Sequence, residues 1–341
     1  MRNYYLKLSD TAWNRTRTAK YFLNLYNRAT LRGAVEIAAQ RERERLLSGF
    51  HDYCRIPVDV ESIAKRRGIC FGPMNIKANN EDANIIPMDN GALLQLNPDR
   101  TDFRKRLTIA HEIGHTLFYR GKEHQIGVLD KKEMQAEETI CFMFARALLM
   151  PPEHIRQFIK KIPDGTPWEI LTELERARQE FKVSLPVLII RIDEIKVRSS
   201  FPCLFLYLRY RENRYTKSDP QLRVDICSSI GDLNHLRTWT NRSAKGLNFQ
   251  SAELLFNSWK NTLVSHREPT GGRYTLNSEG RITRAKPEFI RWISEDINFS
   301  IMKNGRWRNE LIPVHTASFL YVRKGWTEKQ AYIISIIKRF D

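Results

Sequence analysis

The chain has 341 residues, of which 42% are hydrophobic and 11% aromatic. It is therefore long enough to bury the cores of two or three domains and too apolar to be a disordered chain. No stretch approaches the roughly 18 consecutive apolar residues of a membrane helix, and residues 1–10 lack the apolar core of a signal peptide. Five scattered cysteines without a CxxC pair favour reduced thiols and a cytoplasmic protein that has no membrane partner.

The formal net charge is +17, and the basic excess lies at the two ends of the chain. Residues 1–50 carry 10 Lys and Arg against 4 Asp and Glu, and residues 201–341 carry 23 against 13. The middle, residues 51–200, is balanced at 23 against 22. Basic flanks suit contact with nucleic acid, and they equally suit a solvated surface or an acidic protein partner. The sequence leaves both interpretations open.

Two helices are predicted at the N-terminus, over residues 9–31 and 33–54. The first has a cap signal in Ser9 and Asp10 and an apolar side built largely from aromatic residues. The second contains the run Gln40–Arg45, in which charges of both signs alternate. Such alternation predicts a solvated helix face.

Short strands are predicted at residues 69–71, 85–88 and 91–97, around a polar turn rich in Asn. Residues 92–96 read as the best strand and lead by a short loop into the next helix. We expect them to form either an edge that pairs with an extended substrate or a plain buried strand of a small sheet.

The helix that follows contains His111-Glu112-Ile113-Gly114-His115. Positions four apart lie on one face of a helix, so both imidazoles can reach a single cation. A catalytic Zn²⁺ takes three protein ligands and a water whose pKa it lowers to about 7. We therefore predict His111 and His115 as zinc ligands and Glu112 as the general base that accepts the water's proton.

A third ligand is expected from a second helix, which begins near Glu137 and Glu138, continues as an apolar run and ends at Pro151. One of these two acids suits the helix dipole, and the other is the expected ligand. Tyr119, His124 and His154 lie nearby in the sequence and are candidates for stabilising an oxyanion, although such residues are more often surface groups.

After the break at residues 163–167, helices are predicted at residues 168–181 and 184–195, in a helix-turn-helix outline. The second helix is apolar at its start, which favours packing on the preceding domain over reading DNA. Beyond residue 199 we predict strands at 202–210, 222–230 and 311–323 and helices at 251–263 and 327–340, which together make an α+β domain.

Two motifs carry a family resemblance. The run Arg106–His115, followed by a helix that ends Phe144-Ala145-x-x-Leu148-Leu149-Met150-Pro151, resembles the ImmA/IrrE family of metallopeptidases. Weaker similarity at residues 56–69 and 181–185 extends the resemblance over about residues 50–195.

The resemblance implies that the third metal ligand is a glutamate three residues before a small residue of the second helix. With Cys141 as that small residue, the ligand is Glu138. The chain departs from the family pattern at Phe142, where a small polar residue is common, so Glu137 stays open as the alternative ligand.

We expect an α+β fold with a zincin-like metallopeptidase domain at residues 51–158. It would follow an N-terminal helical segment, 1–50, and precede a helix-turn-helix-like subdomain, 159–198, and a basic α+β regulatory or recognition domain, 199–341. The resemblance implies a zinc endopeptidase that cleaves a protein partner, a transcriptional repressor, in stress response or mobile-element defence. The alternative is a nucleic-acid-binding regulator in which the zincin domain acts mainly as an interaction module.

Overall fold

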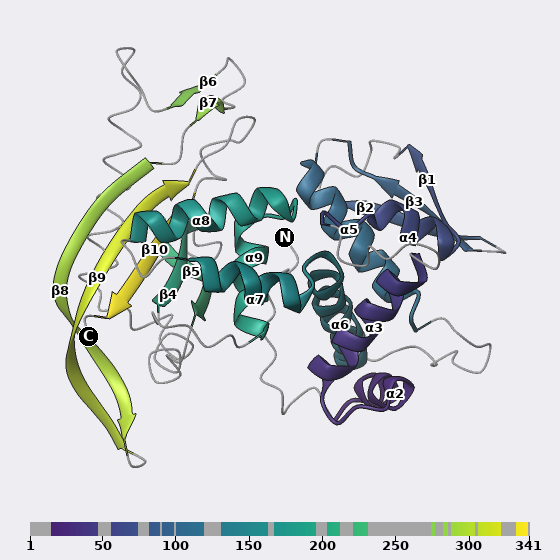
Figure 1. Ribbon diagram of the computed structural model, residues 1–341, viewed down its shortest axis with the longest axis horizontal. Coiled ribbons are helices and arrows are strands. Elements are labelled where there is room, and N and C mark those ends of the chain that lie inside the picture. The colour runs from purple at the N-terminus through teal and green to yellow at the C-terminus, as the bar shows by residue number, and fades with distance from the viewer. Residues whose placement is uncertain are drawn as a thin grey trace. The chain divides into compact units, whose positions relative to one another are not determined.

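The structure is a computed structural model that divides into two compact units (Figure 1). Unit 1 comprises Met1–Lys161 and Glu173–Ile195, and unit 2 comprises Ile162–Thr172 and Lys196–Asp341. The described residues are 15–46, 56–73, 82–88, 91–98, 100–118, 131–162, 167–195, 203–211, 221–230, 274–276, 282–285, 288–303, 306–321 and 332–339. None of the described helices combines the length and apolar character needed to cross a bilayer.

The described part of unit 1 begins with two helices, α2 (Arg17–Tyr26) and α3 (Leu31–Leu46). The Thr16 side chain caps α2 by accepting a hydrogen bond from the Ala19 amide. The helix ends where the next residue, Asn27, adopts a left-handed conformation. Both helices are shorter than predicted, and the remainder of each predicted range lies partly outside the described residues.

The prediction of a solvated face at residues 40–45 is wrong for two of its members. Glu42 and Arg43 are buried, while their neighbours in the run are exposed. Arg43 donates to the backbone oxygen of Ala147 at 2.8 Å, and Glu42 accepts from Arg45 at 2.8 Å. Charge alternation misled the prediction because each buried charge has a partner on a neighbouring turn or element.

A three-stranded sheet follows the short helix α4 (Val60–Arg66). Its strands are β1 (Ile69–Pro73), β2 (Ala83–Met88) and β3 (Gly91–Leu96), in the order β1-β3-β2. Strand β3 is parallel to β1 and antiparallel to β2. Residues 92–96 are therefore the centre of the sheet, and the prediction that they form a substrate-binding edge is wrong.

Gly91 explains how β3 enters the centre of the sheet. Its φ is 148°, and a Cβ at this position would lie 2.0 Å from the backbone oxygen of Gly68. Only glycine allows this approach of two backbones. The next residue, Ala92, donates to the same Gly68 oxygen at 3.0 Å.

Five described helices follow the sheet along the chain: α5 (Asp102–His115), α6 (Lys131–Leu149), α7 (Pro152–Lys161), α8 (Pro167–Glu180) and α9 (Leu185–Ile195). Helix α9 is buried from Leu185 to Asp193 and packs against α6. Its Arg191 donates to the backbone oxygen of Met150 at 3.0 Å. The prediction that this helix packs on the preceding domain is confirmed by its burial and its contact with α6.

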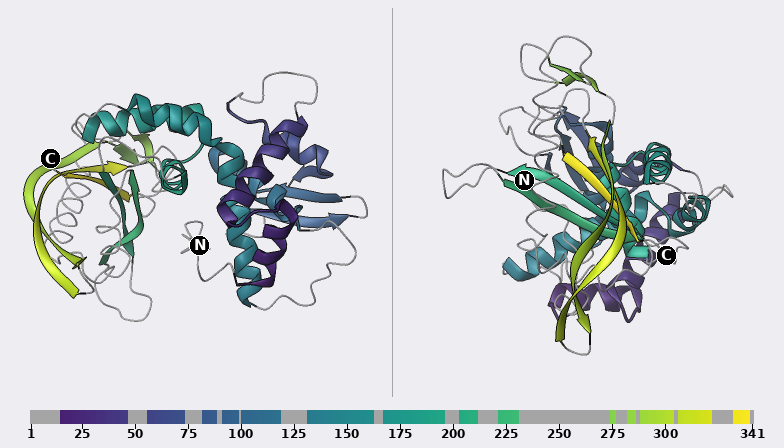
Figure 2. Two further views of the ribbon diagram at one scale, coloured as in Figure 1. Left: turned by 60° about the horizontal axis from the view of Figure 1, so that its bottom comes forward. Right: turned by 90° about the vertical axis from the view of Figure 1, so that its left-hand side faces the viewer.

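Unit 2 contains a five-stranded antiparallel sheet in the order β5-β4-β10-β9-β8. The strands are β4 (Cys203–Arg211), β5 (Gln221–Ile230), β8 (Glu288–Lys303), β9 (Arg306–Tyr321) and β10 (Tyr332–Arg339). Strands β8 and β9 are long, pair along their length and curve strongly (Figure 2). A separate hairpin is formed by β6 (Tyr274–Leu276) and β7 (Ile282–Ala285).

The C-terminal secondary structure was only partly predicted. Strands β4, β5 and β9 match the expectation, whereas the described part of the predicted helix 327–340, residues 332–339, is the strand β10 between β4 and β9. Its sequence YIISIIKR is rich in β-branched residues, which favour a sheet and were outweighed by the cap signal at Thr327. The predicted helix 251–263 lies outside the described residues.

Candidate metal centre

Helix α5 places the two histidines of the pentad on one face. His111 and His115 are one turn apart, and their ring centroids are 4.7 Å apart with an edge-to-face angle of 83°. Neighbouring apolar residues at helical spacing, Ile109 and Ile113, are buried and hold this face of the helix in the core. His111 itself is only 7% exposed.

Helix α6 crosses α5 closely at Gly114 and Cys141. A Cβ on Gly114 would lie 3.1 Å from both Cα and Cβ of Cys141. The absence of a side chain on Gly114 and the small side chain of Cys141 therefore set how near the two helices approach. This crossing brings Glu138, one turn before Cys141, to the two imidazoles.

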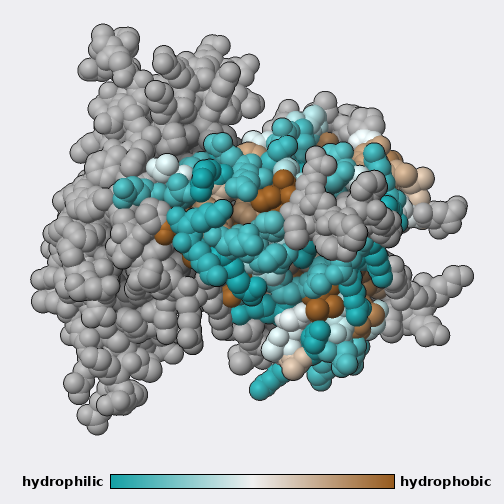
Figure 3. Space-filling model, viewed as in Figure 1, coloured by the Kyte–Doolittle hydropathy of each residue, from teal (hydrophilic) through white to brown (hydrophobic). Residues whose placement is uncertain are grey.

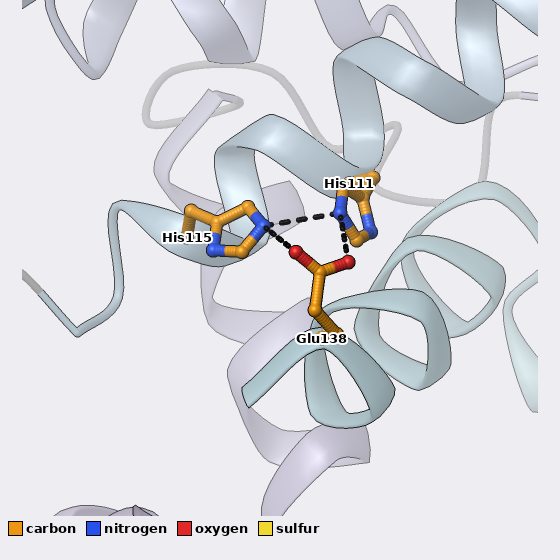
Figure 4. Close-up of side chains that lie close together, drawn as sticks. All are labelled: His111, His115 and Glu138. Carbon is orange, nitrogen blue, oxygen red and sulfur yellow. Dashed lines mark hydrogen bonds and ion pairs between the residues drawn. The ribbon is translucent and has the colours of Figure 1, made fainter. Parts of the chain in front are cut away.

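Three donor atoms converge between these helices (Figure 4). The Nε2 atoms of His111 and His115 are 3.0 Å apart. Glu138 places Oε2 3.5 Å from His111 Nε2 and Oε1 3.7 Å from His115 Nε2. Ligand atoms around a tetrahedral Zn²⁺ with bonds of about 2.0–2.2 Å lie roughly 3.3–3.5 Å from one another. The residues thus fit a zinc ion in donor type, and their separations of 3.0–3.7 Å lie on both sides of this spacing.

Glu137 lies on the other side of His115. Its Oε1 is 2.7 Å from His115 Nδ1, so the carboxylate accepts the Nδ1 proton and leaves Nε2 to face His111 and Glu138. Histidines that bind metals commonly donate their second ring N–H to a carboxylate, which orients the ring. Glu137 is also close to the Cys141 thiol, so His115, Glu137 and Cys141 form a second cluster of potential ligands around Nδ1.

Burial and neighbouring charges set opposite protonation tendencies for the two histidines. Burial lowers the pKa of His111, which favours the neutral ring that a metal requires. Burial also acts to lower the pKa of His115, but Cys141 and the Glu137 hydrogen bond outweigh it and raise that pKa well above its usual value. Burial raises the pKa of the Cys141 thiol to about 11, and the neighbouring His115 acts to lower it.

Phe142 packs directly on the site. Its ring centroid is 4.0 Å from that of His111, at an interplanar angle of 33°. The departure from the family pattern at this position therefore adds an apolar wall against His111. The sequence showed Phe142 only as a departure from the family pattern. Its contact with His111 depends on how α5 and α6 cross, which the sequence does not reveal.

The remaining candidates are placed less closely or not at all. Glu112 is half-buried and follows His111 on α5. His154 lies on α7, where its Nε2 is buried and has no hydrogen-bond partner among the described residues. Tyr119 and His124 lie outside the described part of the chain. The structure thus brings together His111, His115, Glu138 and Glu137.

Comparison with known proteins identifies this region. Residues 64–193 match the family model of the IrrE N-terminal-like domain, Peptidase_M78, which includes α5 and α6 and confirms the resemblance found in the sequence. No curated protein matches the chain. A solved structure described as a Mycobacterium tuberculosis transcriptional regulator matches with a TM-score of 0.48 and 10% identity, over 94% of this chain and 80% of that chain.

Proposed function

Because residues 64–193 form an IrrE N-terminal-like domain, we propose that this chain is a zinc-dependent endopeptidase with its active site between α5 and α6. The observation that carries the proposal is the convergence of His111 Nε2, His115 Nε2 and the Glu138 carboxylate on one point. Two imidazoles and one carboxylate are the ligand set of a catalytic zinc site that keeps one position open.

Zinc bound there would lower the pKa of a bound water and polarise the scissile carbonyl. Glu112 would accept a proton from the attacking water on its carboxylate and pass it to the nitrogen of the departing amine. Glu137 accepts the His115 Nδ1–H and keeps the ring oriented. Glu137 is thus a positioning residue in this proposal, and Glu138 is the third ligand.

The substrate backbone would pair with β2, which forms one edge of the three-stranded sheet. In β3 the amide of Ala92 points toward β1, because it donates to Gly68, and the amide of Asn97 donates to Asp82 on the β2 side. Amides alternate sides along a strand, so the amide of Leu94 points toward β1, away from β2. Ile85 of β2 is paired with Leu94, and its N–H and C=O therefore point away from β3, to the outer side of the sheet. Ile85, Ile86 and Met88 are also exposed, at 36%, 40% and 56%, which suits an apolar, extended segment.

For the identity of the substrate we propose a transcriptional repressor, cleaved in stress response or mobile-element defence. The membership of residues 64–193 in the IrrE N-terminal-like family supports this choice. A Glu112→Gln protein would serve to isolate the substrate, because it is expected to bind the partner without cutting it.

The first test is the zinc content of the full chain with Glu138→Ala and Glu137→Ala as a matched pair. We expect about one zinc per chain in the wild type and in Glu137→Ala at saturating zinc, and loss of zinc in Glu138→Ala. Glu137→Ala should bind zinc roughly ten- to a hundredfold more weakly in a chelator competition, because the ring of His115 is no longer held. Retention of zinc by Glu138→Ala together with its loss in Glu137→Ala would make Glu137 the third ligand and contradict the role proposed for Glu138.

The second test concerns Glu112. Glu112→Gln should keep the wild-type zinc content and lose peptide cleavage, because the amide cannot accept the water's proton. His115→Ala should lose both. Full proteolysis by the Glu112→Gln protein would refute the proposed mechanism.

A further inference from the structure

A cluster of arginines lies on α3 and α4, on elements that carry none of the proposed ligands. Arg41 and Arg45 are one turn apart on α3 and both are exposed. Arg66 of α4 is exposed and donates a hydrogen bond to the backbone oxygen of Arg45. Arg67, directly after α4, completes the group, which we call the arginine cluster: Arg41, Arg45, Arg66 and Arg67.

A single buried acid organises this cluster. Glu42 is 4% exposed and accepts from Arg45 Nη1 at 2.8 Å and from Arg67 Nε at 2.7 Å. The Arg67 side chain is only 9% exposed, while that of Arg45 remains 48% exposed. Two of the four guanidinium groups, those of Arg45 and Arg67, thus share this carboxylate. Set against Glu42 and the exposed Glu44, the four arginines leave a local excess of about two positive charges.

The arginines are held in position rather than free to move apart. The guanidinium of Arg41 lies over the Tyr26 ring, 5.4 Å from its centroid. Arg45 is tied to Glu42, and Arg66 is tied to the last turn of α3. Like charges fixed so near each other repel, and a polyanion that contacts several of them at once relieves the repulsion.

The surrounding surface adds to the positive field. Within residues 15–45, the exposed charged residues are one acid, Glu44, and the six basic residues Arg15, Arg17, Lys20, Arg28, Arg41 and Arg45. Hydrophilic residues predominate over α3 on the face drawn in Figure 3, with only small groups of hydrophobic ones. The opposite side of α3 packs in the core, where Arg43 donates to the backbone oxygen of Ala147 on α6.

We infer that the arginine cluster is a docking surface for the phosphate backbone of nucleic acid. The planar guanidinium fork matches phosphate oxygens in geometry as well as charge, and evenly spaced phosphates can meet several fixed forks at once. The contacts involve no base edge and therefore carry no sequence preference. This inference does not depend on the peptidase proposal, because it concerns other elements and another ligand.

The test measures the binding of the full chain to a short duplex DNA of random sequence over a range of salt concentrations. The variant Arg41→Gln with Arg66→Gln removes two cluster charges. The control Lys160→Gln with Lys161→Gln removes two exposed charges from α7 and leaves the same net charge. We expect the cluster variant to lose affinity on the order of tenfold or more and its log–log salt slope to flatten by about two, with little change in the control.

A second pair of measurements separates phosphate recognition from charge alone. Arg41→Lys with Arg66→Lys keeps the charge and loses the fork, so it should bind several-fold more weakly than the wild type. Polyglutamate should compete poorly with the DNA. Equal losses in the cluster variant and the α7 control, absence of salt-dependent binding, or equal competition by polyglutamate would each overturn the inference. Zinc content, measured on the same variants, should stay unchanged.

Discussion

At the scale of single residues, the site depends on a few side chains whose size matters as much as their chemistry. Gly114 supplies no ligand, yet a Cβ there would press on Cys141 at 3.1 Å. Phe142 likewise supplies no ligand and covers His111 with its ring. The approach of α5 and α6 that brings the three donor atoms together is therefore controlled by residues that a motif for ligands does not contain.

The substitution Gly114→Ala tests this control of the helix crossing. We expect it to lower the free energy of unfolding by about 1–3 kcal/mol, because the added methyl overpacks the contact with Cys141, and to weaken zinc binding. Gly33→Ala, the same change in α3, meets the Thr30 hydroxyl at 3.1 Å and two Arg28 side-chain carbons at 3.8 and 3.9 Å, and no backbone atom of another described helix lies nearer. Because these side chains can shift, it should be neutral or stabilise by up to about 1 kcal/mol. Urea unfolding of both proteins measures the difference, and equal effects would show that the crossing tolerates the methyl.

At the scale of elements, the N-terminal helix α2 is attached to α6, the helix of Glu137 and Glu138. The buried carboxylate of Glu133 on α6 accepts from the Thr18 amide at 2.9 Å, the Thr18 hydroxyl at 2.7 Å and the Arg17 amide at 3.0 Å. It therefore satisfies amides at the start of α2 that have no partner within the helix. Phe22 of α2 packs on Phe118, just beyond α5, with ring centroids 5.4 Å apart.

Replacing Glu133 by Gln should lower the free energy of unfolding by about 1–3 kcal/mol, because one of the two acceptor oxygens becomes an NH2 donor and the other loses its charge. The effect should depend on pH. Burial acts to raise the pKa of Glu133, but the bonds from Thr18 and Arg17 outweigh it and lower that pKa. A carboxylate whose pKa is lowered by folding contributes its full stabilisation when the pH is above the ordinary pKa of about 4.3. This contribution is lost as the pH falls through the lower pKa of the folded state.

The wild type and Glu133→Gln should therefore differ most above about pH 4.3 and converge in more acidic solution. Chemical unfolding at a series of pH values measures this. The exposed Glu180→Gln substitution on α8 is the control and should show little difference at any pH. A Glu133→Gln difference that persists unchanged into acid would contradict the role of the charge.

Strand β2 allows a test of substrate pairing, because successive residues point their N–H groups to opposite sides of the strand. Ile85→Pro removes an N–H that the register turns outward, so the sheet should remain intact while cleavage falls roughly tenfold in kcat/KM for the loss of one backbone hydrogen bond. Ile86→Pro removes an N–H that faces β3 and should destabilise the fold. Ile85→Val keeps the outward N–H and is the control. Unchanged cleavage by Ile85→Pro would exclude this edge as the docking strand.

At the scale of the whole molecule, zinc binding should be linked to global stability, because the ligands come from two helices that converge only in the folded chain. At free zinc a hundred times the Kd, the stabilisation is about 2.7 kcal/mol. For a unit of this size we expect a chelator to lower the Tm by roughly 5–10 °C. His115→Ala, which should bind no zinc, should melt at the same temperature with and without the chelator, and a similar shift in that variant would point to another metal site.

The net charge also acts at this scale, and its meaning changes once the fold is known. Part of the N-terminal excess is internal, since Arg43 is buried and donates to the Ala147 oxygen of α6. The charges left on the surface are nearly all of one sign between residues 15 and 45. A count of charged residues cannot separate the buried charges from the exposed ones, because burial depends on how α3 packs on α6.

The sequence by itself determined the local features of this protein. The spacing of His111 and His115 and the length of the apolar run after Glu138 predicted two helices that the structure contains, because helical periodicity is written in neighbouring residues. The resemblance to the ImmA/IrrE family also came from these motifs and is confirmed by the family-model match over residues 64–193. The roles of His111, His115, Glu138 and Glu112 stay predictions until the metal is measured.

Only the tertiary structure decided features that depend on residues far apart in the chain. The sequence left Glu137 and Glu138 as alternatives, and the crossing at Gly114 and Cys141 placed them on different nitrogens of His115. It also placed β3 at the centre of the sheet rather than at its edge, and β10 between β4 and β9 rather than in a helix. Strand order, helix crossing and the burial of charges are set by long-range packing, which local periodicity does not encode.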